Sequence, residues 1–239
     1  MEIRDDFNLF KLFLEKNINI HVDGSVFKIK VPTIKNLYLN NTINATYHLI
    51  TLGDSERKKL IQNVESSFEF VSTIVFQLGI YKEYSTLAQT IVGGLKELLP
   101  GIEIDYTNKQ FTIEDLIITD EIWEYILYII KLSCGEKVEK PRTFNSEEER
   151  QFYLAQKKMD ERIRKIKSQK PGDSEGLIKS FLTIQYKFNL SFDYLAEQTM
   201  AQIQWLQKYA AGAVSYEVNA QAFAAGNMKK GKKLDFFIK

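Results

Sequence analysis

The hydrophobic and polar positions at the start of the chain predict a short helix followed by a β-hairpin. Residues 19–22 and 25–31 are rich in β-branched side chains and are separated by Asp23-Gly24, a strong short-range signal for a hairpin turn. Before them, residues 5–16 carry apolar side chains at helical spacing, which predicts a short helix. The side chains expected on one side of this helix are Phe7, Phe10 and Leu14.

Helical periodicity dominates the next part of the chain. Pro32 ends the second strand because proline has no amide hydrogen for the ladder, and Thr33 is a suitable cap for a short helix. Apolar residues at steps of three and four then predict a long helix over about 54–79 and a second helix over about 82–99. Pro100-Gly101 breaks the second of these helices.

A second hairpin and a buried helix complete the first predicted domain, residues 1–141. Residues 102–106 alternate apolar and polar, and a polar turn leads into 110–113, which predicts a weaker hairpin. The helix that Thr119 or Asp120 caps is apolar around almost its whole circumference. A helix of this kind is buried, so we expect it at the centre of the domain.

Beyond residue 141 the pattern changes to a charged connecting helix within 142–170. Ser146 and Glu149 have the spacing of a capping box, and the helix extends to about Ser168. Its apolar positions form a thin stripe typical of a coiled-coil seam, which indicates a second surface that covers it. The candidate partner-binding residues on this stripe are Phe152, Met159 and Ile163.

The last part of the chain predicts a helical hairpin, residues 171–228, after a linker at Lys170–Asp173. Ser174 caps its first helix, and Ser191 caps a longer helix in which Gly212 is a candidate bend. The pair carries more aromatic side chains than one hairpin interface needs, so some of them face the first domain, another chain or water. The candidate partner-binding residues here are Trp205, Tyr209 and Phe223.

A basic and aromatic tail, residues 229–239, follows the helical hairpin. Its lysines either bind an acidic partner or keep this segment in water, and its apolar side chains are too few to form a core. We expect them to dock on this chain or on another one. These candidate partner-binding residues are Leu234, Phe236, Phe237 and Ile238.

Composition narrows the function classes. The fold class that these elements predict is α+β, predominantly α. The 239 residues carry a net charge of +1, which gives no overall signal for nucleic acid. The single cysteine excludes an internal disulfide framework and favours a reducing compartment. We expect neither a signal peptide nor a membrane span, because the N-terminus is acidic and no apolar run approaches about 18 residues.

Candidate chemistry is sparse. Cys134 could pair with one of two histidines, His21 or His48, but its place at the end of a buried helix favours a small structural hydrophobe. The carboxylates of Asp120, Glu121 and Glu124 could hold magnesium. Their position at a helix N-terminus also has a simpler explanation, because the helix dipole favours anions there. The chain contains no phosphate-binding loop or nucleophile-elbow motif. We therefore expect no catalysis, no cofactor and no bound metal.

Two stretches carry a family resemblance. The run Asp120-Glu121-Ile122-Trp123-Glu124-Tyr125-Ile126 with the charged helix after it, and the opening Val31-Pro32-Thr33-Ile34-Lys35, resemble structural-module proteins of tailed bacteriophages. The group most similar is the tail assembly chaperones of phages and prophages of Gram-positive bacteria. The resemblance implies a small N-terminal domain with a helical extension, a non-enzymatic role in the host cytoplasm, and the tape-measure and tail-tube proteins as partners.

The same resemblance leaves a second hypothesis open. A permanent virion component, such as a connector, tail or baseplate protein, would share the architecture and form a fixed homo-oligomer. Nucleic-acid binding by the region 142–170 is less favoured, because its nine basic residues are interleaved with five acidic ones.

Overall fold

Two small antiparallel sheets and a larger set of helices make up the described part of the chain, which comprises residues 2–136, 138 and 174–225 of the computed structural model. Helix predominates, so the predicted α+β, predominantly α class is confirmed. The charged helix predicted after Ser146, the linker Lys170–Asp173 and the tail 229–239 lie outside the described residues. The proposed domain boundaries stay predictions.

The first sheet confirms the predicted hairpin. Its strands are β1 (Ile3–Asp5), β2 (Asn17–Val22) and β3 (Ser25–Lys30), in the order β1-β2-β3 and antiparallel throughout. The turn at Asp23-Gly24 sets a register in which Ile18 faces Ile29 and Ile20 faces Phe27. All four of these side chains are buried, so one face of the sheet packs on the core.

The helix predicted over 5–16 is wrong in both its start and its buried face. Strand β1 occupies the first positions, and helix α1 (Leu9–Glu15) begins only after Asn8, whose side chain caps it by accepting a hydrogen bond from the Phe10 amide. Leu12 is the side chain that α1 buries. The predicted apolar face points to water: its exposed members are Phe10 and Leu14.

The long helix predicted over 54–79 is interrupted. At Ile61 the backbone becomes extended, Asn63 adopts a positive φ, and Ser66 caps a new helix by accepting a hydrogen bond from the Glu69 amide. Local polar capping therefore outweighs the continuing apolar periodicity. The helices of this region are α2 (Ile34–Leu39), α3 (Asn41–Ile50), α4 (Asp54–Leu60), α5 (Ser67–Ser72), the π-helical η1 (Thr73–Leu78) and α6 (Lys82–Leu98).

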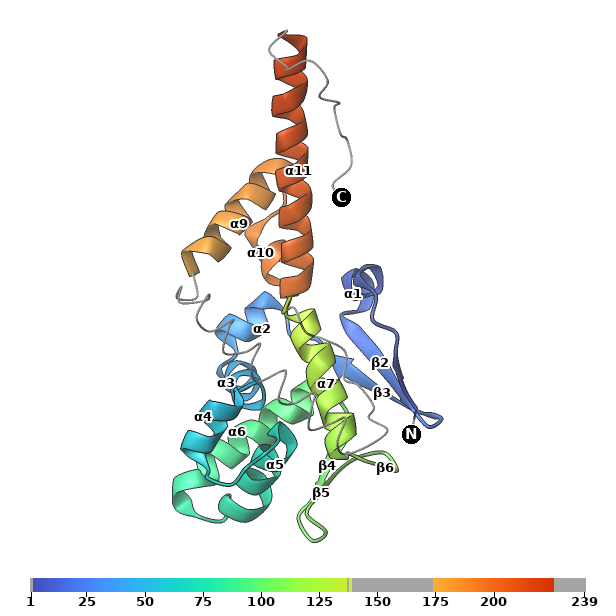
Figure 1. Ribbon diagram of the computed structural model, residues 1–239, viewed down its shortest axis with the longest axis vertical. Helices are drawn as coiled ribbons and strands as arrows, with labels where there is room; N and C mark the ends of the chain where they lie inside the picture. Colours follow the sequence, from blue (N-terminus) through green and yellow to red (C-terminus); the bar gives the residue numbers. More distant parts are fainter. Residues whose placement is uncertain (1, 137, 139–173, 226–239) are drawn as a thin grey trace, which may run out of the picture.

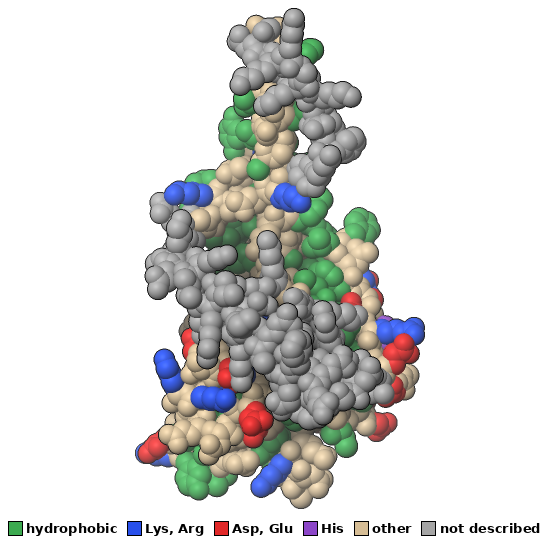
Figure 2. Space-filling view, in the orientation of Figure 1, with side chains coloured by type: hydrophobic (Ala, Val, Ile, Leu, Met, Phe, Trp, Pro, Cys, Tyr) green, Lys and Arg blue, Asp and Glu red, His purple; other side chains and the backbone are tan. Residues whose placement is uncertain are grey.

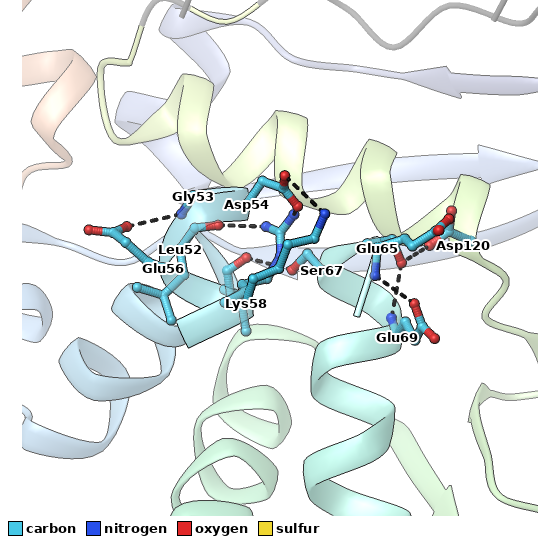
Figure 3. A network of polar contacts seen from close by, with 12 residues as sticks. Leu52, Gly53, Asp54, Glu56, Lys58, Glu65, Ser67, Glu69 and Asp120 are labelled. Atoms are coloured by element: carbon cyan, nitrogen blue, oxygen red, sulfur yellow. Dashed lines mark hydrogen bonds and ion pairs between the residues drawn. The ribbon is translucent and has the colours of Figure 1, made fainter. Parts of the chain in front are cut away.

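The second sheet and helix α7 agree with their predictions, with one added strand. The elements are β4 (Ile102–Asp105), β5 (Gln110–Ile113), β6 (Leu116–Ile117) and α7 (Asp120–Ser133). Thr119 caps α7, and the helix is buried around most of its circumference. The Ser66 hydroxyl donates to Asp120 at 2.6 Å, and Figure 3 shows the start of α5 close to Asp120 at the start of α7.

One large core lies between the sheets and helices α3, α5, α6 and α7. Trp123 of α7 is fully buried in it, and its indole nitrogen donates to the Ser67 hydroxyl at 3.3 Å. Ser67 in turn donates to the Ile50 carbonyl at 2.7 Å, which connects α7, α5 and α3. The aromatic rings of Phe68 and Phe111 pack around the indole.

Three helices follow the undescribed segment: α9 (Ser174–Phe188), α10 (Phe192–Ala196) and α11 (Met200–Ala224). Ser191 caps only the short α10, so the single long helix predicted from Ser191 is wrong. Thr199 begins α11 through a reciprocal capping box with Gln202, and α11 then continues through Gly212 without a break. Figure 1 shows α11 extending away from the body that residues 2–136 form.

A smaller second core holds these helices together and joins them to the body. Phe181, Ile184, Leu195 and Ile203 form it, and Ile34 of α2 contributes a side chain from the first part of the chain. The Ile34 amide also donates to the Gln198 carbonyl at 2.8 Å. Because one α2 residue serves both contacts, the C-terminal helices have a defined attachment.

The crossing of α3 and α6 gives a first prediction. A Cβ on Gly94 would lie 2.1 Å from the Thr46 hydroxyl oxygen, whereas one on Gly93 would meet Thr42 only at 3.3 Å. We expect Gly94→Ala to lower the free energy of unfolding by about 1–3 kcal/mol through overpacking. Gly93→Ala should change it little, or raise it by up to about 1 kcal/mol through helix propensity. Urea unfolding of both variants checks this, and equal effects would contradict the close contact.

Candidate functional site

An open groove lies where α1, the C-terminal end of α7 and the first half of α11 meet. Its volume is about 340 Å³. Phe7, Leu9, Leu132 and Trp205 give it an apolar lining, and Glu136 and Lys208 add opposite charges. We call it the α1–α11 groove. An apolar surface with a few charged groups suits a protein segment better than a small polar molecule.

A row of aromatic rings extends from this groove across α11. Phe13 of α1 meets Trp205 edge to face, with ring centroids 5.9 Å apart. Trp205 stacks on Tyr209 at 5.5 Å, and Tyr209 stacks on Phe188 of α9 at 5.9 Å. The row joins three helices, so α11 is held between α1 and α9 by ring contacts.

The aromatic row is only half covered by the described residues. Trp205 keeps 45% of its surface exposed and Tyr209 keeps 49%. On α1, Phe10 and Leu14 are exposed by 73% and 71%. Figure 2 shows hydrophobic side chains gathered on α1 and on the neighbouring part of α11. Contiguous exposed apolar surface of this kind marks an interaction site more often than scattered single residues do.

Asp6 fixes the position of α1, and therefore one wall of the groove. Its carboxylate accepts hydrogen bonds from the backbone and side-chain nitrogens of Asn19, both at 2.7 Å, and from Lys11. Partial burial works against the charged form, but the hydrogen bonds from Lys11 and Asn19 hold the pKa of Asp6 below its usual value. The carboxylate thus ties α1 to strand β2.

The end of α7 forms the floor of the groove. Gly135 has a φ of +78°, and a Cβ there would lie 2.4 Å from the side-chain nitrogen of Gln204 on α11. The positive φ favours glycine at this position. Beside it, the Tyr47 hydroxyl donates to Glu136 at 2.6 Å, so α3 also supports the groove.

The structure places three of the candidate partner-binding residues. It brings Trp205 and Tyr209 together as a stacked pair. Phe223 follows Trp205 by 18 residues on α11, which at 1.5 Å per residue separates the two by about 27 Å along the helix. Phe223 is exposed. The remaining candidates, which lie outside the described residues, are Phe152, Met159, Ile163, Leu234, Phe236, Phe237 and Ile238.

Sequence reasoning missed the contribution of α1 and α7 to the groove. Phe13, Leu9 and Leu132 line or adjoin it, although they lie far from α11 in the sequence. One signal in the sequence could have indicated it: the 5–16 segment carries more apolar side chains than a helix of seven residues can bury.

The side chains considered for catalysis or metal binding lie on different elements and do not form one site. Burial raises the pKa of Cys134 to about 12, despite a hydrogen bond with Tyr47, so the nucleophilic thiolate is disfavoured at neutral pH. This agrees with the structural interpretation of Cys134. His21 lies exposed on β2, and His48 lies exposed on α3. Asp120 accepts a hydrogen bond from the Ser66 hydroxyl. In the described part of the chain, no three His, Cys, Asp or Glu side chains lie close enough together to hold a metal ion.

Among the described helices, none combines the length and the apolar character needed to cross a bilayer.

Comparisons of this chain with protein-family models, with curated proteins and with solved structures gave no match.

The Asp6 anchor gives a second prediction. Because the pKa of Asp6 is lower in the folded than in the unfolded chain, its stabilisation is present above a pH of about 4 and disappears as the pH falls through the folded-state value. Asp6→Ala should therefore cost about 1–3 kcal/mol of unfolding free energy at pH 7 and much less near pH 3. Urea unfolding at both pH values measures the difference.

Asp115, which is exposed, provides the matched control. Asp115→Ala should have little effect at either pH. A cost for Asp6→Ala that is the same at both pH values would contradict a role for the charged carboxylate.

Proposed function

We propose that this protein is a non-enzymatic assembly factor that binds an apolar helical segment of another protein in the α1–α11 groove. The observation that carries the proposal is the half-exposed stacked pair of Trp205 and Tyr209 beside the apolar lining of the groove. Tryptophan and tyrosine of this kind are the side chains that contribute most to binding energy at protein interfaces.

The groove suits an amphipathic helix. It runs along the contact between α1 and α11, so a third helix that lies over it would pack against both. Apolar side chains of the partner at i, i+3 or i+4, and i+7 would meet Leu9, Leu132 and Trp205. The opposite charges of Lys208 and Glu136 would favour one orientation of the bound helix.

The resemblance to tail assembly chaperones supplies the biological setting of the proposal. In that setting the partner is the tape-measure protein of a tailed phage, with the tail-tube protein as a second partner, and binding takes place in the host cytoplasm before the tail matures. A long, apolar, helical partner of this kind has the chemistry that the groove would accept.

One observation favours the alternative of a permanent virion component. The distal part of α11 extends beyond its contacts with α9, and exposes Val218 and Phe223 (Figure 1). A fixed neighbour in a ring or a connector would cover such a helix.

A binding experiment gives the third prediction. Leu9→Glu introduces a charge into the groove and should weaken the affinity for apolar helical fragments of the tape-measure protein by about tenfold or more. Ile80→Glu is the matched control, because Ile80 is an equally apolar side chain that is 80% exposed and does not line the groove. Isothermal titration calorimetry of the wild type and both variants measures the effect.

Two outcomes of that titration would contradict the groove. One is an absence of binding by the wild type, and the other is an equal loss for Leu9→Glu and Ile80→Glu. Mass spectrometry of finished particles then separates the two functions. A chaperone is absent from them, whereas stoichiometric copies would replace the chaperone proposal by the virion component.

A further inference from the structure

One side of α11 carries a seven-residue repeat. On a helix with 3.6 residues per turn, residues at alternating steps of four and three stay within about 80° of the circumference. The positions that are seven apart hold Tyr, Tyr and Phe in one set and Trp, Gly and Asn in the other. The six residues, which we call the α11 seam, are Trp205, Tyr209, Gly212, Tyr216, Asn219 and Phe223.

Most of the seam lies away from the side of α11 that packs on α9; the exception is Tyr209, whose half-exposed ring also stacks on Phe188. Ile203 and Ala210, which are buried, mark that packed side, and Glu217 on the same side forms an ion pair with Lys187 of α9. On the seam, Trp205 and Phe223 are 45% and 60% exposed. Figure 1 shows that the distal part of α11 stands clear of the other described helices.

We infer that the α11 seam binds the same seam of a second copy of this chain, with the two helices antiparallel. In an antiparallel pair whose two-fold axis crosses α11 at the level of Val214, each seam residue meets a different seam residue of the second copy. The three contacts, each made twice, are Trp205 with Phe223, Tyr209 with Asn219, and Gly212 with Tyr216.

Side-chain chemistry favours each of these contacts. Gly212 has no side chain, so it leaves space for the Tyr216 ring of the second copy. The Asn219 amide can bond the Tyr209 hydroxyl. A parallel pair would instead place Gly212 opposite Gly212 and leave a void, which is costly at a helix interface.

Charge also favours a second copy. Lys208 and Glu217 are the only charged side chains of α11, and Glu217 is already paired with Lys187 on the α9 side. A nearly uncharged surface such as the seam can meet its own copy without placing like charges opposite each other.

The size of the surface sets the expected strength. A fully buried aromatic side chain covers about 150–250 Å², so the exposed parts of Trp205, Tyr209 and Phe223 supply on the order of 600 Å² for the pair. Phe223 of the second copy also falls beside Trp205, where the α1–α11 groove can accept its ring. This area is smaller than the roughly 1,000 Å² that a stable specific interface needs, so we expect a weak dimer with a Kd in the range of about 1–100 µM.

The dimer requires only a second copy of this chain and does not rest on the proposed binding of another protein. Sedimentation of the full chain across this concentration range tests it. Phe223→Glu should weaken dimerisation by about tenfold or more, whereas Val218→Glu, on the same helix, exposed, but off the seam, should not. A wild type that stays monomeric, or a dimer that both substitutions weaken equally, would overturn the inference.

Cysteine pairs test the orientation. Positions 209 and 219 lie about 15 Å apart on one helix, too far for an internal disulfide, so the double variant Tyr209→Cys with Asn219→Cys can cross-link only between copies. We expect oxidation to give covalent dimers of the double variant and none of Asn219→Cys alone. The wild type, whose one cysteine is the buried Cys134, is the background control. Cross-linking of Asn219→Cys alone would mean parallel helices and overturn the pairing.

If the tail occupies the seam instead, removal of residues 229–239 should convert a monomer into a dimer. A wild type that dimerises only after this removal would overturn self-association as the resting state of the chain.

Discussion

The buried indole of Trp123 is the constraint on which the rest of the structure depends. An indole N–H at the centre of a core must have a hydrogen-bond acceptor, because an unsatisfied one costs about 1–3 kcal/mol. The Ser67 hydroxyl supplies that acceptor, and it donates its own hydrogen bond to the Ile50 carbonyl. The start of α5, the end of α3 and the first turn of α7 are therefore held together by two hydrogen bonds.

The position of the candidate site derives from the same helix. Helix α7 passes through the core, and its C-terminal end reaches the groove at Leu132 and Gly135, where it meets α11. From the other side, Ile34 of α2 holds the junction between α10 and α11. The groove thus has a rigid floor. Its wall from α1 depends on Asp6, which is a polar anchor that the pH can weaken.

The sequence predicted the elements whose signals are local. The Asp23-Gly24 turn, the Thr33 and Thr119 caps, and the apolar circumference of α7 each act within a few residues, and the structure contains all of them. The breaks at Ser66 and Thr199 were missed because helical apolar periodicity continues across both, although Ser66 with Glu69 and Thr199 with Gln202 have the spacing of a capping box.

The groove could not be predicted in the same way. It joins α1, α7 and α11, and no pattern along the chain records which helices meet. The buried side of α1 was likewise decided by its tertiary contacts: Leu12 faces the core, whereas Phe10 and Leu14 were the expected residues.

The buried thiol of Cys134 has a use that is independent of the proposed partners. It sits at the end of α7, directly under the groove, and its burial keeps it protonated and out of reach of reagents. A thiol-modifying compound can react only when this part of the molecule opens. The chain therefore contains a natural reporter, at a single position, of how often the floor of the groove comes apart.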